Sequence, residues 1–169
     1  MKIEYPKPPE PEFMSEDTKY ILDVCNGRRM HWFPNQQKNT IHMNREDTLN
    51  VKPDLIGDFR HIPFPDETFR LVVFAPPPLR RSGESRRSGN IDPRFWKDDL
   101  RAGFNECFRV LIRCGVLVFK WNEQNAHPSQ VIPLAPERPV CWQKSGQTHI
   151  MVFSKSLSFL KQNQPQTER

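Results

Sequence analysis

Residues 71–80, LVVFAPPPLR, run an apolar strand straight into three consecutive prolines. The first four residues form a continuous apolar run, which is typical of a parallel strand covered on both faces. Pro76, Pro77 and Pro78 each fix φ and lack an N–H donor, so a strand cannot continue through them. The sequence therefore predicts a central strand that ends at Ala75 in a rigid lip.

Other apolar runs of strand type lie on both sides of this lip and alternate with helical or irregular segments. A short helix is expected at residues 129–135. Strands are expected at residues 19–25, 39–44, 54–59, 69–75, 114–121, 139–142 and 148–155, with the last two as an antiparallel closing pair. Alternation of this kind predicts an α/β domain with a mostly parallel central sheet.

A longer helix is predicted over residues 93–111, after a polar connection. Pro93 lies near its start, a position where helices tolerate proline. The apolar residues of this segment fall on one helical stripe, formed by Leu100, Phe104, Cys107, Phe108 and Leu111.

The length of 169 residues fits one domain with polar ends. We expect a Pro- and Glu-rich arm at residues 1–17, a single domain at residues 18–156 and a polar tail at residues 157–169. The formal net charge of +5 permits an anionic partner such as nucleic acid. No apolar run approaches the roughly 20 residues of a spanning helix, so we expect no membrane partner.

The cysteine pattern argues against a metal centre. None of Cys25, Cys107, Cys114 and Cys141 belongs to a CxxC pair, so no zinc or other metal site is expected. The first twenty residues lack the apolar core of a secretory signal. We therefore expect reduced thiols and a cytoplasmic location.

Polar residues follow the first three predicted strands, at the end where parallel sheets bind ligands. Asp23 and Gly27 could accept a ligand amine and let it approach the backbone, or could form a tight turn with a capping Asp. Asn44 could hydrogen-bond a ribose hydroxyl or belong to a solvated loop. Asp58 and Phe59 could bind the amino edge and the face of an adenine.

Three segments carry a resemblance to a known family: LDVCNGRR at residues 22–29, DFRHIPFPDETFRLVVFAPPP at 58–78 and ECFRVLIRCGVLVFKWNE at 106–123. In this order they resemble class I S-adenosylmethionine-dependent methyltransferases over residues 20–155, and most of all a small phage- and prophage-type group related to adenine-N6 DNA enzymes. The resemblance implies a Rossmann-like fold. It also implies an S-adenosylmethionine cofactor bound by Asp23, Cys25, Gly27, Asn44, Asp58 and Phe59.

The lip departs from the motif of that family, which is Asp-Pro-Pro-His. The acid of the motif accepts a hydrogen bond from the target amine, but here Ala75 replaces it and Pro78 replaces the planar residue. Pro76 and Pro77 are kept. The resemblance thus implies two alternatives. One is a methyltransferase acting on nucleic acid, with an adenine amino group as the leading acceptor and Ala75–Pro78 as its altered catalytic motif. The other is an inactive relative that serves as a cofactor-binding, regulatory or partner-binding module.

A serine- and glycine-rich loop after the lip carries four arginines, Arg80, Arg81, Arg86 and Arg87. They are expected to contact phosphates, with a solvated loop as the alternative. Lys120 and Trp121 are expected to add nucleic-acid contacts, although Trp121 could instead be a buried residue at a strand end. A domain of this size leaves little room for separate target recognition, so we expect a protein partner, a homodimer or low sequence specificity.

Overall fold

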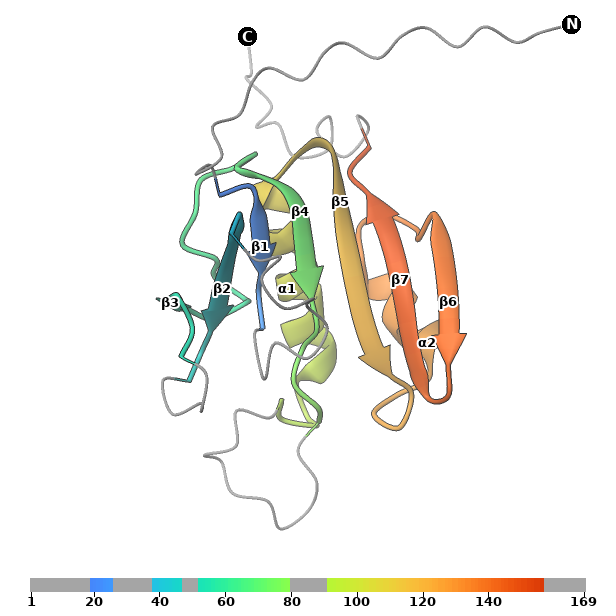
Figure 1. Ribbon diagram of the computed structural model, residues 1–169. Coiled ribbons are helices and arrows are strands. Elements are labelled where there is room, and N and C mark those ends of the chain that lie inside the picture. The colour runs from blue at the N-terminus through green and yellow to red at the C-terminus, as the bar shows by residue number, and fades with distance from the viewer. Residues whose placement is uncertain (1–18, 26–37, 47–51, 80–90, 157–169) are drawn as a thin grey trace, which may run out of the picture.

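Seven strands form one sheet in the order β3-β2-β1-β4-β5-β7-β6 (Figure 1). The computed structural model describes residues 19–25, 38–46, 52–79 and 91–156, so the expected arm and tail lie outside the described residues. The strands are β1 (Ile21–Asp23), β2 (Thr40–Asn44), β3 (Leu55–Ile56), β4 (Phe69–Phe74), β5 (Leu111–Asn122), β6 (Cys141–Ser145) and β7 (Thr148–Ser154).

The first five strands are parallel to one another, and β7 is antiparallel to both of its neighbours, β5 and β6. The predicted mostly parallel sheet with an antiparallel closing strand is therefore confirmed. The chain places β2 and β3 on one side of β1, and β5 on the far side of β4. Strand order thus reverses between β1 and β4, and open parallel sheets bind ligands at the carboxyl ends of strands at such a reversal.

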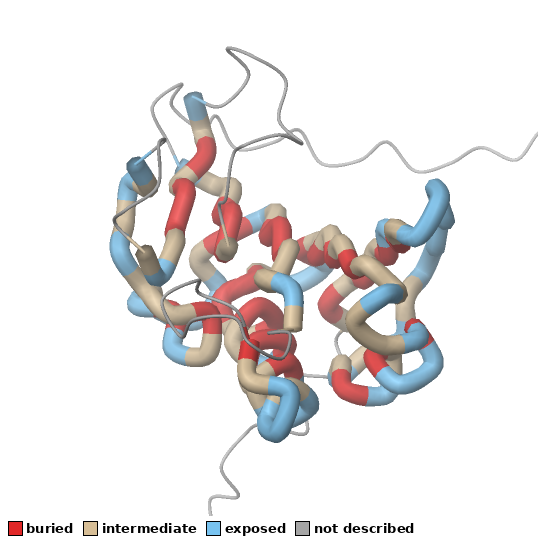
Figure 2. The backbone as a smooth tube through the Cα atoms, turned by 90° about the horizontal axis from the view of Figure 1, so that it is seen from below, coloured by how far each residue is buried: buried red, intermediate tan, exposed pale blue. Residues whose placement is uncertain are grey.

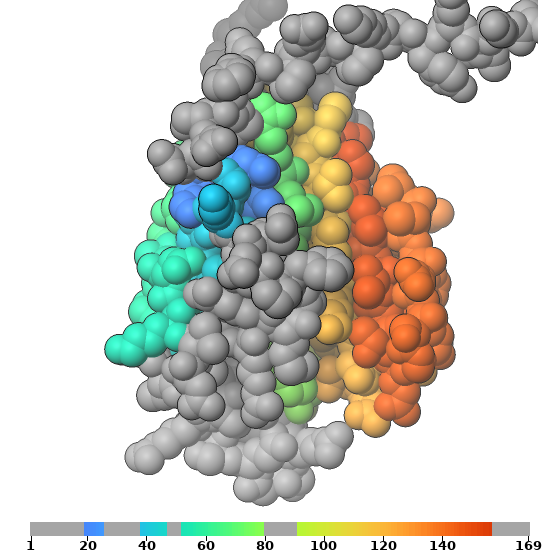
Figure 3. Space-filling model, viewed as in Figure 1, coloured from blue at the N-terminus to red at the C-terminus, as the bar shows by residue number. Residues whose placement is uncertain are grey.

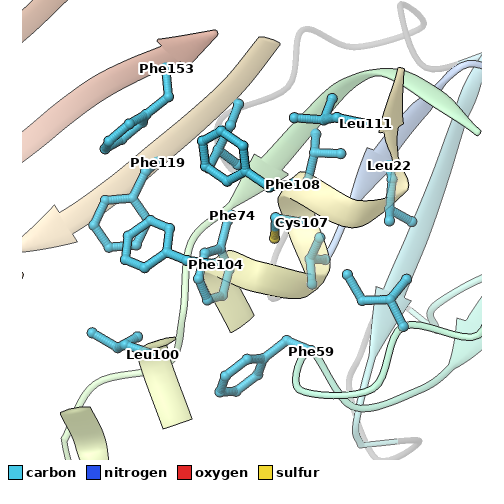
Figure 4. Close-up of a cluster of buried hydrophobic side chains, with 14 of the residues drawn as sticks. Leu22, Phe59, Phe74, Leu100, Phe104, Cys107, Phe108, Leu111, Phe119 and Phe153 are labelled. Carbon is cyan, nitrogen blue, oxygen red and sulfur yellow. The ribbon is translucent and has the colours of Figure 1, made fainter. Parts of the chain in front are cut away.

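Helix α1 (Trp96–Val110) connects β4 to β5 and covers one face of the sheet (Figure 1). The Phe104 ring lies 4.7 Å from the Phe119 ring of β5 and 5.7 Å from the Phe74 ring of β4 (Figure 4). The helix begins after Pro93 because Asp92 holds a turn there: its carboxylate accepts the N–H of Arg94 at 3.0 Å. The buried residues of α1 include the predicted stripe up to Phe108.

Gly103 allows α1 to approach the sheet closely. A Cβ at this position would lie 2.7 Å from Cδ2 of Phe59 and 2.8 Å from Cζ of Phe74. Real Cβ atoms do not come this close to other heavy atoms, so any larger residue would push the helix or the two rings away. The absence of a side chain at Gly103 therefore sets the spacing between α1 and the end of β4.

The short helix predicted at residues 129–135 is α2 (Pro128–Val131) followed by a 3-10 helix, η2 (Ile132–Leu134). Val131 and Leu134 join the same hydrophobic core as α1. Figure 2 shows buried residues where the sheet meets these helices and exposed residues along the outer edge formed by β6.

Several strands differ in extent from the expectation. β1 covers only Ile21–Asp23 of the expected residues 19–25, and β6 covers Cys141–Ser145 in place of residues 139–142. β3 has only two residues, because the run continues into a turn in which the Arg60 N–H donates to Asp58 Oδ1 at 3.0 Å. β5 begins at Leu111, earlier than predicted. The expected Cys-Gly turn is instead an irregularity inside this strand: Cys114 has a φ of 58°, and the register with β4 shifts between Phe69 and Leu71.

Candidate functional site

Asp23 ends β1 beside the point where strand order reverses. Parallel pairing places it opposite His42 of β2 and Val73 of β4. Its carboxylate is fully buried, and Oδ2 lies 3.4 Å from Nδ1 of the equally buried His42. The predicted donor-side acid is therefore at the expected strand end, but it lies beneath the surface and beside a histidine that the sequence reasoning did not select.

Cys25 follows Asp23 and is half-buried. Burial, with a smaller contribution from the Asp23 carboxylate, raises the pKa of the Cys25 thiol well above its ordinary value. The side chain is therefore a neutral thiol at physiological pH. Gly27, which the resemblance also places on the donor side, lies outside the described residues.

Asn44 ends β2 and is tied to the segment that carries Asp58. Its side-chain Oδ1 accepts the N–H of Glu46 at 3.0 Å, and its backbone carbonyl accepts the N–H of Gly57 at 2.9 Å. The structure thus brings together the ends of β2 and β3. The side chains of Asn44 and Asp58 are both partly exposed at these strand ends.

Asp58 is held by Arg60. The guanidinium donates from Nε to Oδ1 at 2.9 Å and from Nη2 to Oδ2 at 2.6 Å, and its Nη1 donates to Asp99 of α1 at 3.0 Å. Partial burial raises the pKa of Asp58, but the hydrogen bonds from Arg60 outweigh it and the net pKa is lower than usual. Asp58 is therefore a fixed, ionised acceptor, and Arg60 is a residue that sequence reasoning missed.

The Phe59 ring lies in the hydrophobic core rather than at the ligand-binding edge. It is 7% exposed and its centroid is 5.4 Å from that of Phe74 (Figure 4). Gly103 of α1 lies close to the Phe59 ring and covers it on the side that faces this helix. In this arrangement Phe59 packs against the end of β4, and its ring is not available to stack on an adenine.

The proline lip follows β4 and is held at its far end. Ala75, Pro76 and Pro77 are half-buried and Pro78 is exposed. Because the prolines have no N–H, Leu79 is the first residue after Ala75 that can donate, and its N–H donates to Oδ1 of Asn125 at 3.3 Å.

The segment after the arginine-rich loop returns to the same place. Ile91 donates its N–H to the carbonyl of Pro78 at 3.1 Å, and Leu79 and Ile91 form a parallel bridge. The four predicted phosphate-binding arginines, Arg80, Arg81, Arg86 and Arg87, lie between these anchors and outside the described residues.

Trp121 near the end of β5 is buried, with 1% of its surface exposed. Its ring stacks with those of Trp96, at 6.3 Å, and Phe119, at 6.0 Å, and its Nε1 donates to the carbonyl of Ala126 at 2.8 Å. This favours the buried-residue alternative, because no aromatic face is left for a base. Lys120 precedes it and points to the other face of the sheet, half-buried.

Solved structures share this arrangement of strands. A protein from Pyrococcus horikoshii, PH0226, superposes with a TM-score of 0.60 at 16% identity and 83% coverage of both chains. An S-adenosylmethionine-dependent methyltransferase from Methanosarcina mazei gives 0.56 at 11% identity, over 83% of this chain and 94% of that one. The 16S rRNA N2 G1207 methyltransferase of T. thermophilus, solved with AdoMet and guanosine, gives 0.54 at 13% identity, over 82% of this chain and 35% of that one. The sequence matches no family model and no curated protein.

The chain has the methyltransferase fold. The predicted fold class is thereby confirmed, while the narrower resemblance to the phage-type adenine-N6 group stays a prediction.

The methyltransferase fold here carries a hydrogen-bond network that sequence reasoning missed, which joins the end of β5 to β6 and the start of β7. Nε2 of buried His149 lies 2.8 Å from Oε2 of Glu123. Nδ1 of the same ring accepts a hydrogen bond from Nε1 of Trp142 at 2.9 Å. An indole N–H can only donate, so Nδ1 is unprotonated and Nε2 carries the proton. Lys144 donates to both oxygens of Glu123, at 2.9 and 3.0 Å.

This network keeps Glu123 ionised. Hydrogen bonds from Lys144 and then His149 lower the pKa of the Glu123 carboxyl. The only sequence signal for it is the polar segment after β5, which also contains Asn125. The partners lie on other strands, so the sequence does not show that they meet.

Two further findings concern ligands and membranes. Across the described parts of the chain, no three His, Cys, Asp or Glu side chains are grouped so that they could hold a metal ion. None of the described helices combines the length and the apolar character needed to cross a bilayer.

Proposed function

We propose that the protein is an S-adenosylmethionine-dependent methyltransferase that acts on an amino group of a nucleic-acid base, with the adenine amino group as the leading acceptor. One observation carries the proposal. The ends of β1, β2 and β3, with Asp23, Asn44 and Asp58, lie at the reversal of strand order beside the lip that ends β4. The methyltransferase fold of the solved neighbours supports it.

The described residues fit the cofactor in outline. Asp58 Oδ1 accepts two hydrogen bonds from Arg60 and Oδ2 accepts one, and a carboxylate oxygen can accept two, so Oδ2 has capacity for an adenine amine. Asn44 would receive a ribose hydroxyl. Bound S-adenosylmethionine would supply an electrophilic methyl group. Asp23 would lie beneath the cofactor, where its buried carboxylate is 3.4 Å from Nδ1 of His42.

The lip would orient the acceptor through its backbone. Pro76 and Pro77 present carbonyl groups that can accept hydrogen bonds from an amine, and Ala75 leaves room for a substrate that needs no acid there. The nucleic-acid part of the proposal is supported by the basic sequence around the lip and by the neighbour that is described as an rRNA methyltransferase solved with guanosine. Lys120 and the four arginines would contact phosphates.

A second candidate is an inactive relative that binds a cofactor or partner without turnover. Ala75 favours it, because the side-chain acceptor of the family motif is missing. Glu123, the carboxylate at the end of neighbouring β5, is already held by Lys144 and His149. Loss of one well-placed polar group typically costs about a hundredfold or more in rate.

A donor titration combined with methyl transfer separates these readings. We expect calorimetry to show S-adenosylmethionine binding by the wild type, at least tenfold weaker binding by Asp58→Asn, and no change for Asp98→Asn, an exposed carboxylate on α1. Labelled methyl should then pass to unmethylated DNA or RNA. Binding without transfer, with activity gained in Ala75→Asp, would establish the inactive relative instead. No binding by the wild type would refute the methyltransferase and the cofactor-binding form of the inactive relative, and would leave a partner-binding module as the remaining reading.

A further inference from the structure

Among the described residues, β6 is an edge strand of the sheet. It is the last strand in the order, next to β7, and all five of its residues are exposed (Figures 1 and 3). An edge strand presents a row of backbone N–H and C=O groups that a further strand can pair with. The β6 edge is therefore a surface on which main-chain hydrogen bonds could extend the sheet.

Apolar side chains gather at this edge. Val140 is 67% exposed, Trp142 51% and Ile150 37%, and together they are three of the five large hydrophobic residues that are exposed in the described part of the chain. Trp142 pairs with Met151, and Ile150 pairs with Gln143, the residue next to Trp142. Because neighbouring residues of a strand point to opposite faces, the side chains of Trp142 and Ile150 lie on opposite faces of the sheet at this edge. Tryptophan is among the residues that contribute most to protein interfaces.

The usual protection of edge strands is weak here. β6 contains no proline, and the ammonium of its one charged residue, Lys144, is paired with both carboxylate oxygens of Glu123. Trp142 is held by its hydrogen bond to buried His149. The indole is thus fixed in place while half of its surface remains exposed, and little side-chain freedom would be lost if a partner covered it.

The sequence of β6 is also suited to pairing with itself. If two copies pair antiparallel about Gln143, Trp142 of one copy lies opposite Lys144 of the other, and Cys141 lies opposite Ser145. On each side of the two-fold axis the exposed indole of Trp142 can then pack on the aliphatic stem of Lys144 of the other copy, while the ammonium stays paired with its own Glu123. No like charges face each other in this register.

We propose that two copies of this chain associate through antiparallel pairing of their β6 strands about Gln143. The interface is isologous, because the same strand serves on both sides, and it joins two seven-stranded sheets into one continuous sheet. The proposal does not depend on the methyltransferase activity, because it rests only on the geometry of the edge.

The test is the oligomeric state of the full chain across a concentration series. Sedimentation velocity from about 1 to 200 µM covers the affinity range of small interfaces. We expect the wild type to shift from a 20.0 kDa monomer to twice that mass. Gln143→Lys places two lysines opposite each other and should stay monomeric over the concentrations at which the wild type dimerises. Ile56→Lys, at an exposed apolar residue of β3 on the other edge, should dimerise like the wild type.

A mixing experiment tests the register. Gln143→Lys and Gln143→Glu should each be monomeric alone and should form a mixed dimer when combined, because opposite charges then meet at the two-fold axis. Unchanged melting temperatures of the separate variants will show that they fold. A wild type that stays monomeric throughout the series overturns the proposal, as do a Gln143→Lys variant that still dimerises and a mixture that does not associate.

Discussion

Single carboxylates at the edges of this molecule are held by arginine or lysine, and Glu106 of α1 shows what such a contact does for stability. Its Oε2 accepts the N–H of Ile62 at 2.7 Å, and its Oε1 accepts a hydrogen bond from Nε of Arg109 at 2.7 Å. Arg109 in turn donates to the carbonyls of Ile62 and Phe64. One ion pair thus fastens the turn before β4 to the helix after it.

The pKa of Glu106 gives a prediction with a definite sign. Partial burial raises this pKa, but the hydrogen bonds from Arg109 and Ile62 outweigh it, so the folded pKa lies below the usual 4.5. The stabilisation is complete above the unfolded pKa and is lost as the pH falls through the folded pKa. Urea unfolding between about pH 6 and 3 should therefore show a shallower acid decline for Glu106→Gln than for the wild type. Asp98→Asn, at an exposed pair, should leave the decline unchanged; equal slopes for all three proteins would contradict the assignment.

At the scale of elements, the distance between α1 and the sheet depends on Gly103, which has no side chain. A methyl group at Gly103 would meet the rings of Phe59 and Phe74. Gly103→Ala should destabilise the fold by about 1–3 kcal/mol, even though alanine favours helices by about 1 kcal/mol over glycine. Asn105→Ala, at an exposed position of the same helix, should be neutral or slightly stabilising in the same denaturant titration. A stabilised Gly103→Ala would show that the core can yield there.

The lip is held by contacts with other segments, because its prolines have no N–H and cannot donate the backbone hydrogen bonds of a sheet. Loss of the Asn125 acceptor should expose the Leu79 amide to solvent and lower the hydrogen-exchange protection factor of this amide by about tenfold. Asn125→Ala should therefore lose this protection, and Asn125→Asp, which keeps an acceptor oxygen, should retain most of it. Exchange of the Leu71 amide inside β4 serves as the internal control. Equal protection in all variants would mean that the 3.3 Å contact does not hold the lip.

For the whole molecule, the mostly parallel sheet, its antiparallel closing strand and the helix after the lip could be predicted, because long apolar runs that alternate with helical segments have few alternatives. Which way a strand-end aromatic points could not be predicted. Phe59 was expected to face an adenine, and the sequence leaves Trp121 open between a base contact and burial; both are buried in the core. The contacts that organise the edge join residues far apart in sequence, as Leu79 and Asn125 do. Such pairings follow from the fold and leave no local pattern. Asp23, Asn44 and Asp58 could be placed at strand ends from the sequence, because each ends or closely follows an apolar run, and their roles stay a prediction.

The bridge between Leu79 and Ile91 has an evolutionary consequence. Paired strands lie about 4.8 Å apart, so Leu79 and Ile91, which precede and follow residues 80–90, are separated by only one strand spacing. A segment with such closely spaced ends can be lengthened, shortened or exchanged with little strain on the rest of the fold. Natural variation, or grafting in the laboratory, could therefore change the basic insert at this junction while the prolines and their anchors stay as they are.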